Sequence, residues 1–192
     1  MRKTRLEAFS DGVMAIIITI MVLELKMPEG ADWHALQSVI PALFTYALSF
    51  VYIAIYWNNH HHLLHVAKHI SVGIMWGNAN LLFWLSLIPF ATGWMGENHF
   101  QPFPVAVYSG LLICCGISYT ILQKTIEACH KDDKRLKAFM QRQSRKGIVS
   151  VIAYASAVPL AYVNTIFSGI IFVLIAILWL VPDKKSEEII NE

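Results

Sequence analysis

Six long apolar stretches separated by short polar segments dominate the sequence of 192 residues. A helix needs about 20 mostly apolar residues to cross the hydrocarbon core of a bilayer, so a chain of this length holds about six crossings and little else. Only 15% of the residues are charged, compared with about 25% in soluble domains. The sequence therefore predicts an all-α integral membrane protein that forms a single domain over residues 1–192. Its six transmembrane helices are expected at about residues 9–26, 39–64, 74–95, 105–122, 148–162 and 165–181.

The amino terminus is similar to a secretory signal peptide, because basic residues precede an apolar run from Val13 to Leu23. Cleavage is not expected, because Asp11 lies within the segment and no small-residue cleavage pattern follows it. Glu24 and Lys26 close the segment, and the next one is again apolar. We therefore expect a retained first transmembrane helix.

The last two segments run together, since residues 147–181 contain no Lys, Arg, Asp or Glu. One straight helix of that length would extend about 52 Å, and a bilayer core of about 30 Å cannot bury it. We therefore predict two short helices joined by a tight hairpin near Pro159–Asn164.

The basic residues are distributed asymmetrically around the predicted helices. With the amino terminus in the cytoplasm, all of the 15 Lys and Arg residues except Lys26 fall on the cytoplasmic side, which is the distribution found in membrane proteins. They lie at the amino terminus, at Lys68, in residues 124–146 and in the tail at Lys184 and Lys185. Both termini are therefore predicted to be cytoplasmic. The charged run Cys129–Lys146 is expected to be a solvated, helix-compatible connector near anionic lipid head groups.

Several functional classes find no support in the sequence. The formal net charge of +2 is too small to indicate a nucleic-acid partner. The motifs of zinc proteases, of nucleophile elbows and of phosphate-binding loops are absent from the sequence, and the predicted loops are too short to hold a catalytic domain. We expect no enzymatic activity and no cofactor. The three cysteines make no disulfide framework.

Polar side chains inside the predicted helices are costly in a membrane and therefore indicate packing or function. They are Ser10, Asp11, Thr19 and Glu24 in the first helix, Asn58, Asn59 and His60–His62 in the second, and Asn78 and Asn80 in the third. If the first two helices are antiparallel neighbours, Asp11 lies at the depth of His60 and His61. A proton relay through these groups and a purely structural network are both open interpretations.

The histidines of the second helix also have the spacing of metal ligands. His61 and His65, and likewise His65 and His69, are separated by four residues and lie on one helix face. No cysteine or acidic residue lies nearby in the sequence to complete a ligand set. We therefore expect no metal site.

One face of the first helix carries apolar residues and a single threonine. At 100° per residue, a stripe about 100° wide is shared by six residues. They are Gly12, Ile16, Thr19, Ile20, Leu23 and Met27. Asp11 falls about 140° from Ile16, on the opposite side. Because any uniformly apolar helix yields such a stripe, the geometry alone does not identify a pore, but Asp11 and the stripe must face different surroundings.

Two motifs and a third segment resemble those of a known family. Residues Arg5–Asp11 match the signature RxxxFSD at the start of a first helix, and Trp57–His61 match W-x-x-H-H in a second helix. Leu87–Phe90 with Thr92 resembles the end of that family's third helix. On these residues the chain is similar to the transmembrane protein 175 family, the endolysosomal potassium channels and their bacterial homologues. The last three helices are similar mainly in hydropathy and length.

The resemblance implies a potassium channel that is weakly selective for K⁺ over Na⁺ and lies in a bacterial cell membrane. Animal members are similar to two tandem six-helix repeats that pair, whereas this chain has one repeat. The resemblance therefore implies a homotetramer with a pore on its fourfold axis, lined by the first helix. Permeant K⁺ and the lipid bilayer are the expected partners.

The resemblance also implies roles for particular residues. Ile16 takes the position of the main hydrophobic constriction, Thr19 that of a threonine one turn along, and Ile20 and Leu23 those of further apolar rings. The implied scaffold around the first helix comprises Arg5, Phe9, Ser10, Asp11, Trp57, Asn58, His60 and His61. Glu24, at the end of the first helix, is expected to concentrate cations at the outer mouth.

Two other functions compete with a channel. A proton-coupled or cation secondary transporter would use Asp11 and the histidines of the second helix. A membrane assembly protein that conducts no ions is the third hypothesis. Flux measurements distinguish the three.

Overall fold

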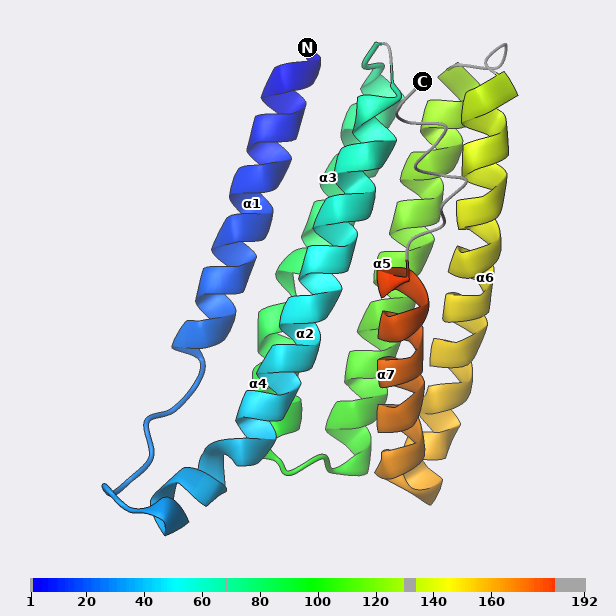
Figure 1. Cartoon of the computed structure of the whole chain (residues 1–192). Helices are drawn as coiled ribbons and strands as arrows, with labels where there is room; N and C mark the ends of the chain where they lie inside the picture. Colours follow the sequence, from blue (N-terminus) through cyan, green and yellow to red (C-terminus); the bar gives the residue numbers. More distant parts are fainter. Residues whose placement is uncertain (1, 68, 130–133, 182–192) are drawn as a thin grey trace.

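The computed structural model describes residues 2–67, 69–129 and 134–181, and it gives no side-chain detail for residues 134–139 and 142. The described residues form seven helices and their connections, and no strand occurs among them (Figure 1). The helices are α1 (Lys3–Leu23), α2 (Trp33–His65), α3 (Val72–Ser86), α4 (Ile88–Glu97), α5 (Pro102–Cys129), α6 (Lys134–Val163) and α7 (Thr165–Leu180). Lys68, Lys131, Lys184 and Lys185, which enter the predicted membrane orientation, lie outside the described residues.

The lengths and hydropathies of these helices confirm the predicted class, an all-α membrane protein. Five described helical segments are long and apolar enough to cross a membrane. They are α1, α2, the combined segment Val72–Glu97, α5 and the Gln143–Val163 part of α6. The sixth predicted segment forms α7, a shorter apolar helix of 16 residues.

The third predicted segment contains a break that hydropathy does not reveal. α3 ends at Ser86 and α4 begins at Ile88, with Leu87 between them. Pro89 occupies the first turn of α4, where its missing N–H costs nothing, whereas inside a continuous helix it would remove a hydrogen bond. The third span therefore consists of two stacked helices rather than one.

The charged connector between the fourth and fifth predicted spans is mostly helical, as its sequence allowed. α5 continues to Cys129 and α6 begins at Lys134, so most of the charged run Cys129–Lys146 is helical. The predicted hairpin is present, but the helix tolerates Pro159 and turns only at Asn164. The Asn164 side chain accepts a hydrogen bond from the backbone N–H of Ile166 at 2.9 Å and so caps α7.

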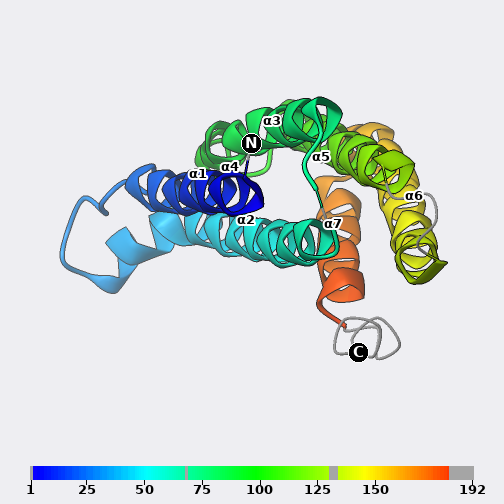
Figure 2. The same ribbon diagram turned by 90° about the horizontal axis from the view of Figure 1, so that it is seen from above.

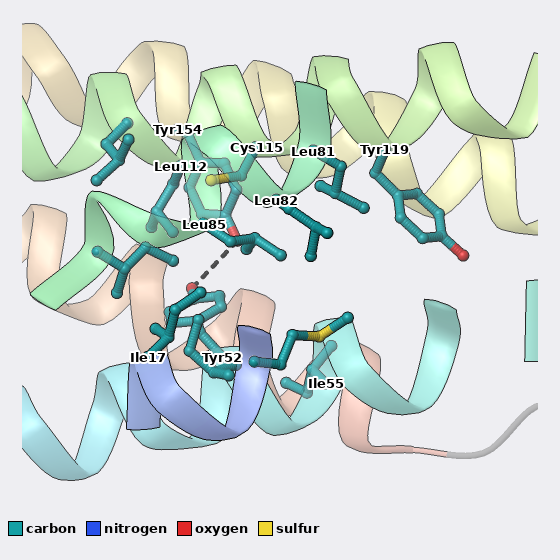
Figure 3. Packing of buried hydrophobic residues seen from close by; sticks show 14 of the residues in the cluster. Ile17, Tyr52, Ile55, Leu81, Leu82, Leu85, Leu112, Cys115, Tyr119 and Tyr154 are labelled. Carbon is teal, nitrogen blue, oxygen red and sulfur yellow. Dashed lines mark hydrogen bonds between the residues drawn. The ribbon is translucent and has the colours of Figure 1, made fainter. Parts of the chain in front are cut away.

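The helices form three groups that share a common core. Seen from above, α1 and α2 lie together, α3, α4 and α5 form a row beside them, and α6 and α7 lie at the far end of that row (Figure 2). In the core, Leu82 and Leu85 of α3 pack between Tyr52 of α2 and Leu112 of α5 (Figure 3). Because lipid is as apolar as these side chains, close packing and hydrogen bonds between helices stabilise this arrangement.

Buried hydroxyl groups supply several of these hydrogen bonds. Thr92 of α4 donates to Ser49 of α2 at 2.7 Å, and Ser49 pairs with the Tyr108 hydroxyl of α5 at 2.9 Å. Tyr154 of α6 donates to the Tyr52 hydroxyl at 3.2 Å, and Tyr52 donates to a backbone carbonyl of α7 at 2.7 Å. Each such bond within a membrane contributes about 0.6 kcal/mol on average. Together they connect α2 to the four helices α4, α5, α6 and α7.

Gly96 lies where α4 packs tightly against α2. A Cβ added at Gly96 would lie 2.6 Å from the Thr45 hydroxyl oxygen and 2.8 Å from the Cα of Ala42. Because backbone cannot move aside, we expect Gly96→Ala to lower the free energy of unfolding by about 1–3 kcal/mol, as overpacking does elsewhere. Thermal unfolding in detergent measures the change. Gly110→Ala is the matched control, because a Cβ at Gly110 meets no atom within 4 Å; equal melting temperatures for the two variants would contradict the prediction.

Candidate functional site

One face of α1 is buried against its own subunit. Its buried side chains are Leu6, Ser10, Met14, Ile17 and Met21. Their spacing of three and four residues is that of a single helix face, and this face packs against α2, α3 and α4. The opposite face of α1 therefore faces away from the subunit core.

The stripe predicted from helical angles lies on this opposite, exposed face. Ile16 is 58% exposed and Leu23 is 81% exposed, and Ile20 and Thr19 are also exposed. A Cβ added at Gly12 meets no atom within 4 Å, so none of the described residues of the same subunit covers this part of the stripe. Four exposed side chains of the predicted stripe can thus contact other subunits, lipid or ions. They are Ile16, Thr19, Ile20 and Leu23.

Thr19 is the polar group of the stripe. Its hydroxyl donates a hydrogen bond to the backbone carbonyl of Ile16 at 2.8 Å. A hydroxyl that donates its hydrogen in this way retains lone pairs on the oxygen. The Thr19 oxygen can therefore accept a hydrogen bond or contact a cation.

Behind α1, three buried polar side chains form a hydrogen-bonded cluster. The Asn78 side-chain oxygen lies 2.6 Å from Nε2 of His60, and the Asn78 amide donates to the Ser10 hydroxyl at 3.0 Å. Ser10 and His60 are each at most 1% exposed, as is Asn78. The cluster joins α1, α2 and α3 at one depth, and none of its side-chain N or O atoms lacks a partner. We call Ser10, His60 and Asn78 the α1 anchor.

Asp11 makes a separate contact, and this corrects the expectation that it meets His60 and His61. Its carboxylate accepts a hydrogen bond from Nε1 of Trp57 at 3.0 Å. His60 is turned instead toward Asn78, while His61 stacks between Trp57 and His65 with ring centroids 6.3 and 6.2 Å away. Asp11 and His60 therefore have different hydrogen-bond partners.

The remaining members of the predicted scaffold lie on the surface of the described subunit. Arg5, Phe9 and Asn58 are exposed, and they take no part in the hydrogen bonds of the α1 anchor or of Asp11. Lys3 of the same end of α1 instead donates to the backbone carbonyl of His65 at 2.6 Å. Lys3 and Asp11 thus each make a direct hydrogen bond from α1 to α2.

Asn78 is the residue whose importance the motifs do not indicate. It lies in α3, outside both motifs, yet it joins the motif residues Ser10 and His60. In the sequence, Asn78 stands out because its amide lies within an apolar run. A polar group is costly in such a position unless it is hydrogen-bonded. Helical angles do not say which of Asn78 and Asn80 faces α1.

At the other end of α1, charged residues border a cleft of about 490 Å³. Glu24 lines this cleft, as do Glu29 and Glu97. Lys26 pairs with Glu97 at 2.9 Å and so connects the loop after α1 to the end of α4. Negatively charged side chains therefore outnumber the one lysine at this end of the stripe.

The histidine row does not converge on a metal site in the described structure. Among the described residues, no three His, Cys, Asp or Glu side chains are placed to hold a metal ion. His61 and His65 use their ring faces for stacking.

Comparison with known proteins decides the family. The family model described as endosomal/lysosomal potassium channel TMEM175 matches residues 5–89. A potassium channel of Chryseobacterium sp. (strain P1-3) is 46% identical over 192 residues, which are 100% of each chain. The chain belongs to the TMEM175 family. The resemblance that the motifs indicated is thus confirmed, and the TMEM175 family is one of ion channels rather than enzymes.

Other TMEM175 proteins match over different lengths. The crystal structure of a lysosomal potassium-selective channel TMEM175 homolog from Chamaesiphon minutus superposes with a TM-score of 0.80. It is 26% identical and covers 93% of this chain and 96% of the other. Human TMEM175, named an endosomal/lysosomal proton channel, is 37% identical over 79 residues, which are 34% of this chain and 16% of the human one.

Proposed function

We propose that this protein is a potassium channel of a bacterial cell membrane, with a weak preference for K⁺ over Na⁺. The observation that carries the proposal is the exposed stripe on α1, which contains Ile16, Thr19, Ile20 and Leu23. Its support is the end-to-end similarity to a bacterial potassium channel. Both termini are proposed to be cytoplasmic, in keeping with the basic residues at the amino terminus.

One subunit cannot enclose a pore with a single exposed helix face. Several copies must therefore bring their α1 stripes together around an axis. We propose a homotetramer, in which four single six-helix repeats surround the pore. In this arrangement the buried face of α1 stays on its own subunit and the stripe faces the axis.

The proposed gate is a ring of Ile16 side chains. A narrow apolar constriction loses its water, and an ion crosses a dry segment only at a high cost in free energy. Small rotations of α1 that widen the ring would admit water and then a cation. The α1 anchor holds the cytoplasmic half of α1 on α2 and α3, so such a rotation would pivot around it.

Weak selectivity follows from the chemistry of the stripe. Strongly selective filters replace the hydration shell of K⁺ with rings of carbonyl oxygens. Within the stripe, the side-chain oxygen of Thr19 is the one group that can contact a cation. Potassium passes more readily because it loses water more easily than sodium, and Glu24 concentrates cations of either kind at the outer mouth.

The competing carrier hypothesis makes a testable distinction at Asp11. Since Asp11 lies opposite the stripe and accepts a hydrogen bond from Trp57, Asn can keep that bond through its side-chain oxygen. We expect Asp11→Asn to retain potassium flux in liposomes, within about threefold of wild type, which corresponds to less than 1 kcal/mol. The flux should also rise without saturation as the K⁺ concentration rises.

Purified oligomers of known mass provide the control for this measurement. A saturating flux that Asp11→Asn abolishes in an intact oligomer would identify a carrier. The absence of any flux from such oligomers would support the non-conducting assembly protein. Either outcome would overturn the channel proposal.

A further inference from the structure

A small cavity lies inside the subunit, where α2, α5, α6 and α7 meet. Its volume is about 30 Å³, and a cavity needs about 10–15 Å³ to hold one water molecule. Its described lining residues include none from α1, so the cavity does not belong to the proposed pore. Six of the lining residues carry a side-chain oxygen atom: Tyr52, Tyr56, Asn59, Tyr119, Ser150 and Tyr154.

Four hydroxyl groups of the cavity wall already donate their hydrogen atoms elsewhere. Tyr154 donates to the Tyr52 hydroxyl at 3.2 Å (Figure 3), and Tyr52 donates to a backbone carbonyl of α7 at 2.7 Å. Ser150 donates to a backbone carbonyl of its own helix at 2.8 Å, and Tyr119 donates to the side-chain oxygen of Gln143 at 2.9 Å. A hydroxyl oxygen retains lone pairs after it has donated its hydrogen. The wall therefore offers acceptors that have no hydrogen left to donate.

The Tyr56 hydroxyl has the opposite need. The Tyr56 ring packs edge-to-face on Tyr119, with ring centroids 6.2 Å apart. Among the described residues, none exchanges a hydrogen bond with the Tyr56 hydroxyl. A tyrosine hydroxyl inside a protein normally has a hydrogen-bond partner, because an unpaired polar group there is costly. The Tyr56 hydroxyl therefore lacks an acceptor, although oxygen atoms with free lone pairs line the same cavity.

One molecule can connect the Tyr56 donor with the acceptors of the wall. We propose that the cavity binds a water molecule that accepts the hydrogen of Tyr56 and donates its own two hydrogens to hydroxyl oxygens of α5 and α6. Tyr119 supplies such an oxygen from α5, and Ser150 and Tyr154 supply them from α6. Three hydrogen bonds are the usual number for a buried water molecule. The water thereby joins α2 to α5 and α6.

The chemistry of the wall favours water over an ion. All of the described lining residues are uncharged, so an ion would lose its hydration without an opposite charge to replace it. A cation cannot accept the hydrogen of Tyr56, and an anion cannot donate to the oxygen atoms of the wall. Water does both.

Radiolytic footprinting of the full-length protein in lipid nanodiscs tests the proposal. An X-ray pulse converts water into hydroxyl radicals, which oxidise the nearest aromatic rings, and mass spectrometry locates the modified residues. We expect Tyr56 and Tyr154 to be oxidised severalfold faster than Tyr108. Tyr108 is the internal control, because it is as buried as Tyr154 but lies outside the cavity and pairs with Ser49. Oxidation of Tyr154 and Tyr56 that is as slow as that of Tyr108 would overturn the proposal.

Tyr56→Phe provides a second test, because it removes the donor and keeps the ring. A hydrogen bond to bound water is nearly as favourable as a direct one, so we expect the midpoint of thermal unfolding to fall by about 2–4 °C. Tyr46→Phe is the matched control and should leave the midpoint unchanged, because Tyr46 is a half-buried tyrosine of the same helix that lines the open cleft instead. A higher midpoint for Tyr56→Phe would show that the hydroxyl had no partner. That result, or an unchanged midpoint, would contradict the bound water.

Discussion

Replacing Ile16 with asparagine is expected to raise the resting potassium conductance of the reconstituted protein. In the proposed tetramer, the change places four amide groups in an apolar ring, where they hold water that the isoleucines exclude. A barrier lowered by about 1.4 kcal/mol raises the rate tenfold, and we expect an increase of at least this size. Potassium efflux from liposomes under a defined gradient measures it.

Val22→Asn provides the matched control for Ile16→Asn. Val22 is 46% exposed, and Ile16 is 58% exposed, on the same helix. At 100° per residue, Val22 lies about 120° away from Ile16 and outside the stripe. Its replacement should leave the conductance near that of the wild type. Equal fluxes from wild type and Ile16→Asn would argue against a gate at Ile16, and equal increases in both variants would indicate a general effect of polarity on α1.

Asn78→Leu should produce the largest loss of stability among single substitutions in the α1 anchor. Leucine has a similar size but leaves Nε2 of the buried His60 without the hydrogen bond it now makes at 2.6 Å, whereas the Ser10 hydroxyl keeps its bond to the Leu6 carbonyl at 2.8 Å. Each buried polar group without a partner costs about 1–3 kcal/mol. We expect a loss of about 1–3 kcal/mol for the unpaired His60, measured as a lower midpoint of thermal unfolding.

The control for Asn78→Leu is Asn58→Leu, because Asn58 is exposed and lies outside the anchor. It should change the midpoint little. An unchanged melting temperature for Asn78→Leu would show that the anchor does not stabilise the packing of α1.

Most of the fold follows from hydropathy and chain length. The apolar stretches predict the all-α class because a membrane helix must satisfy all its backbone hydrogen bonds internally. The hydropathy pattern misses the break between α3 and α4 at Leu87, because the residues on both sides of Pro89 are apolar and the pattern shows one continuous segment. It also begins the fifth span too late, since the charged first half of α6 is helical before the predicted membrane segment.

The candidate site could be predicted only in part. Helical angles place Ile16 and Asp11 on opposite sides of α1, and the structure exposes the first and pairs the second with Trp57. The partners of Ser10 and His60 depend on how α3 is rotated against α1 and α2, which no periodicity within one helix specifies. Asn78 therefore emerges as a site residue only once the packing is known.

The buried hydroxyl groups illustrate the same limit. Ser49 and Thr92 are common helix residues in membranes, and nothing in their spacing marks them as a pair. They lie 43 residues apart in the sequence but within 2.7 Å in space. Contacts of this kind depend on the crossing of α2 and α4, which Gly96 permits.

The reversal potential of single-channel currents tests the central claim most directly. The purified protein is placed in a planar bilayer with potassium on one side and an equal concentration of sodium on the other. We expect step-like currents that reverse at a potential displaced toward the potassium equilibrium potential but well short of it. Reversal at the proton equilibrium potential, or the absence of current steps from intact oligomers, would contradict a weakly selective potassium channel.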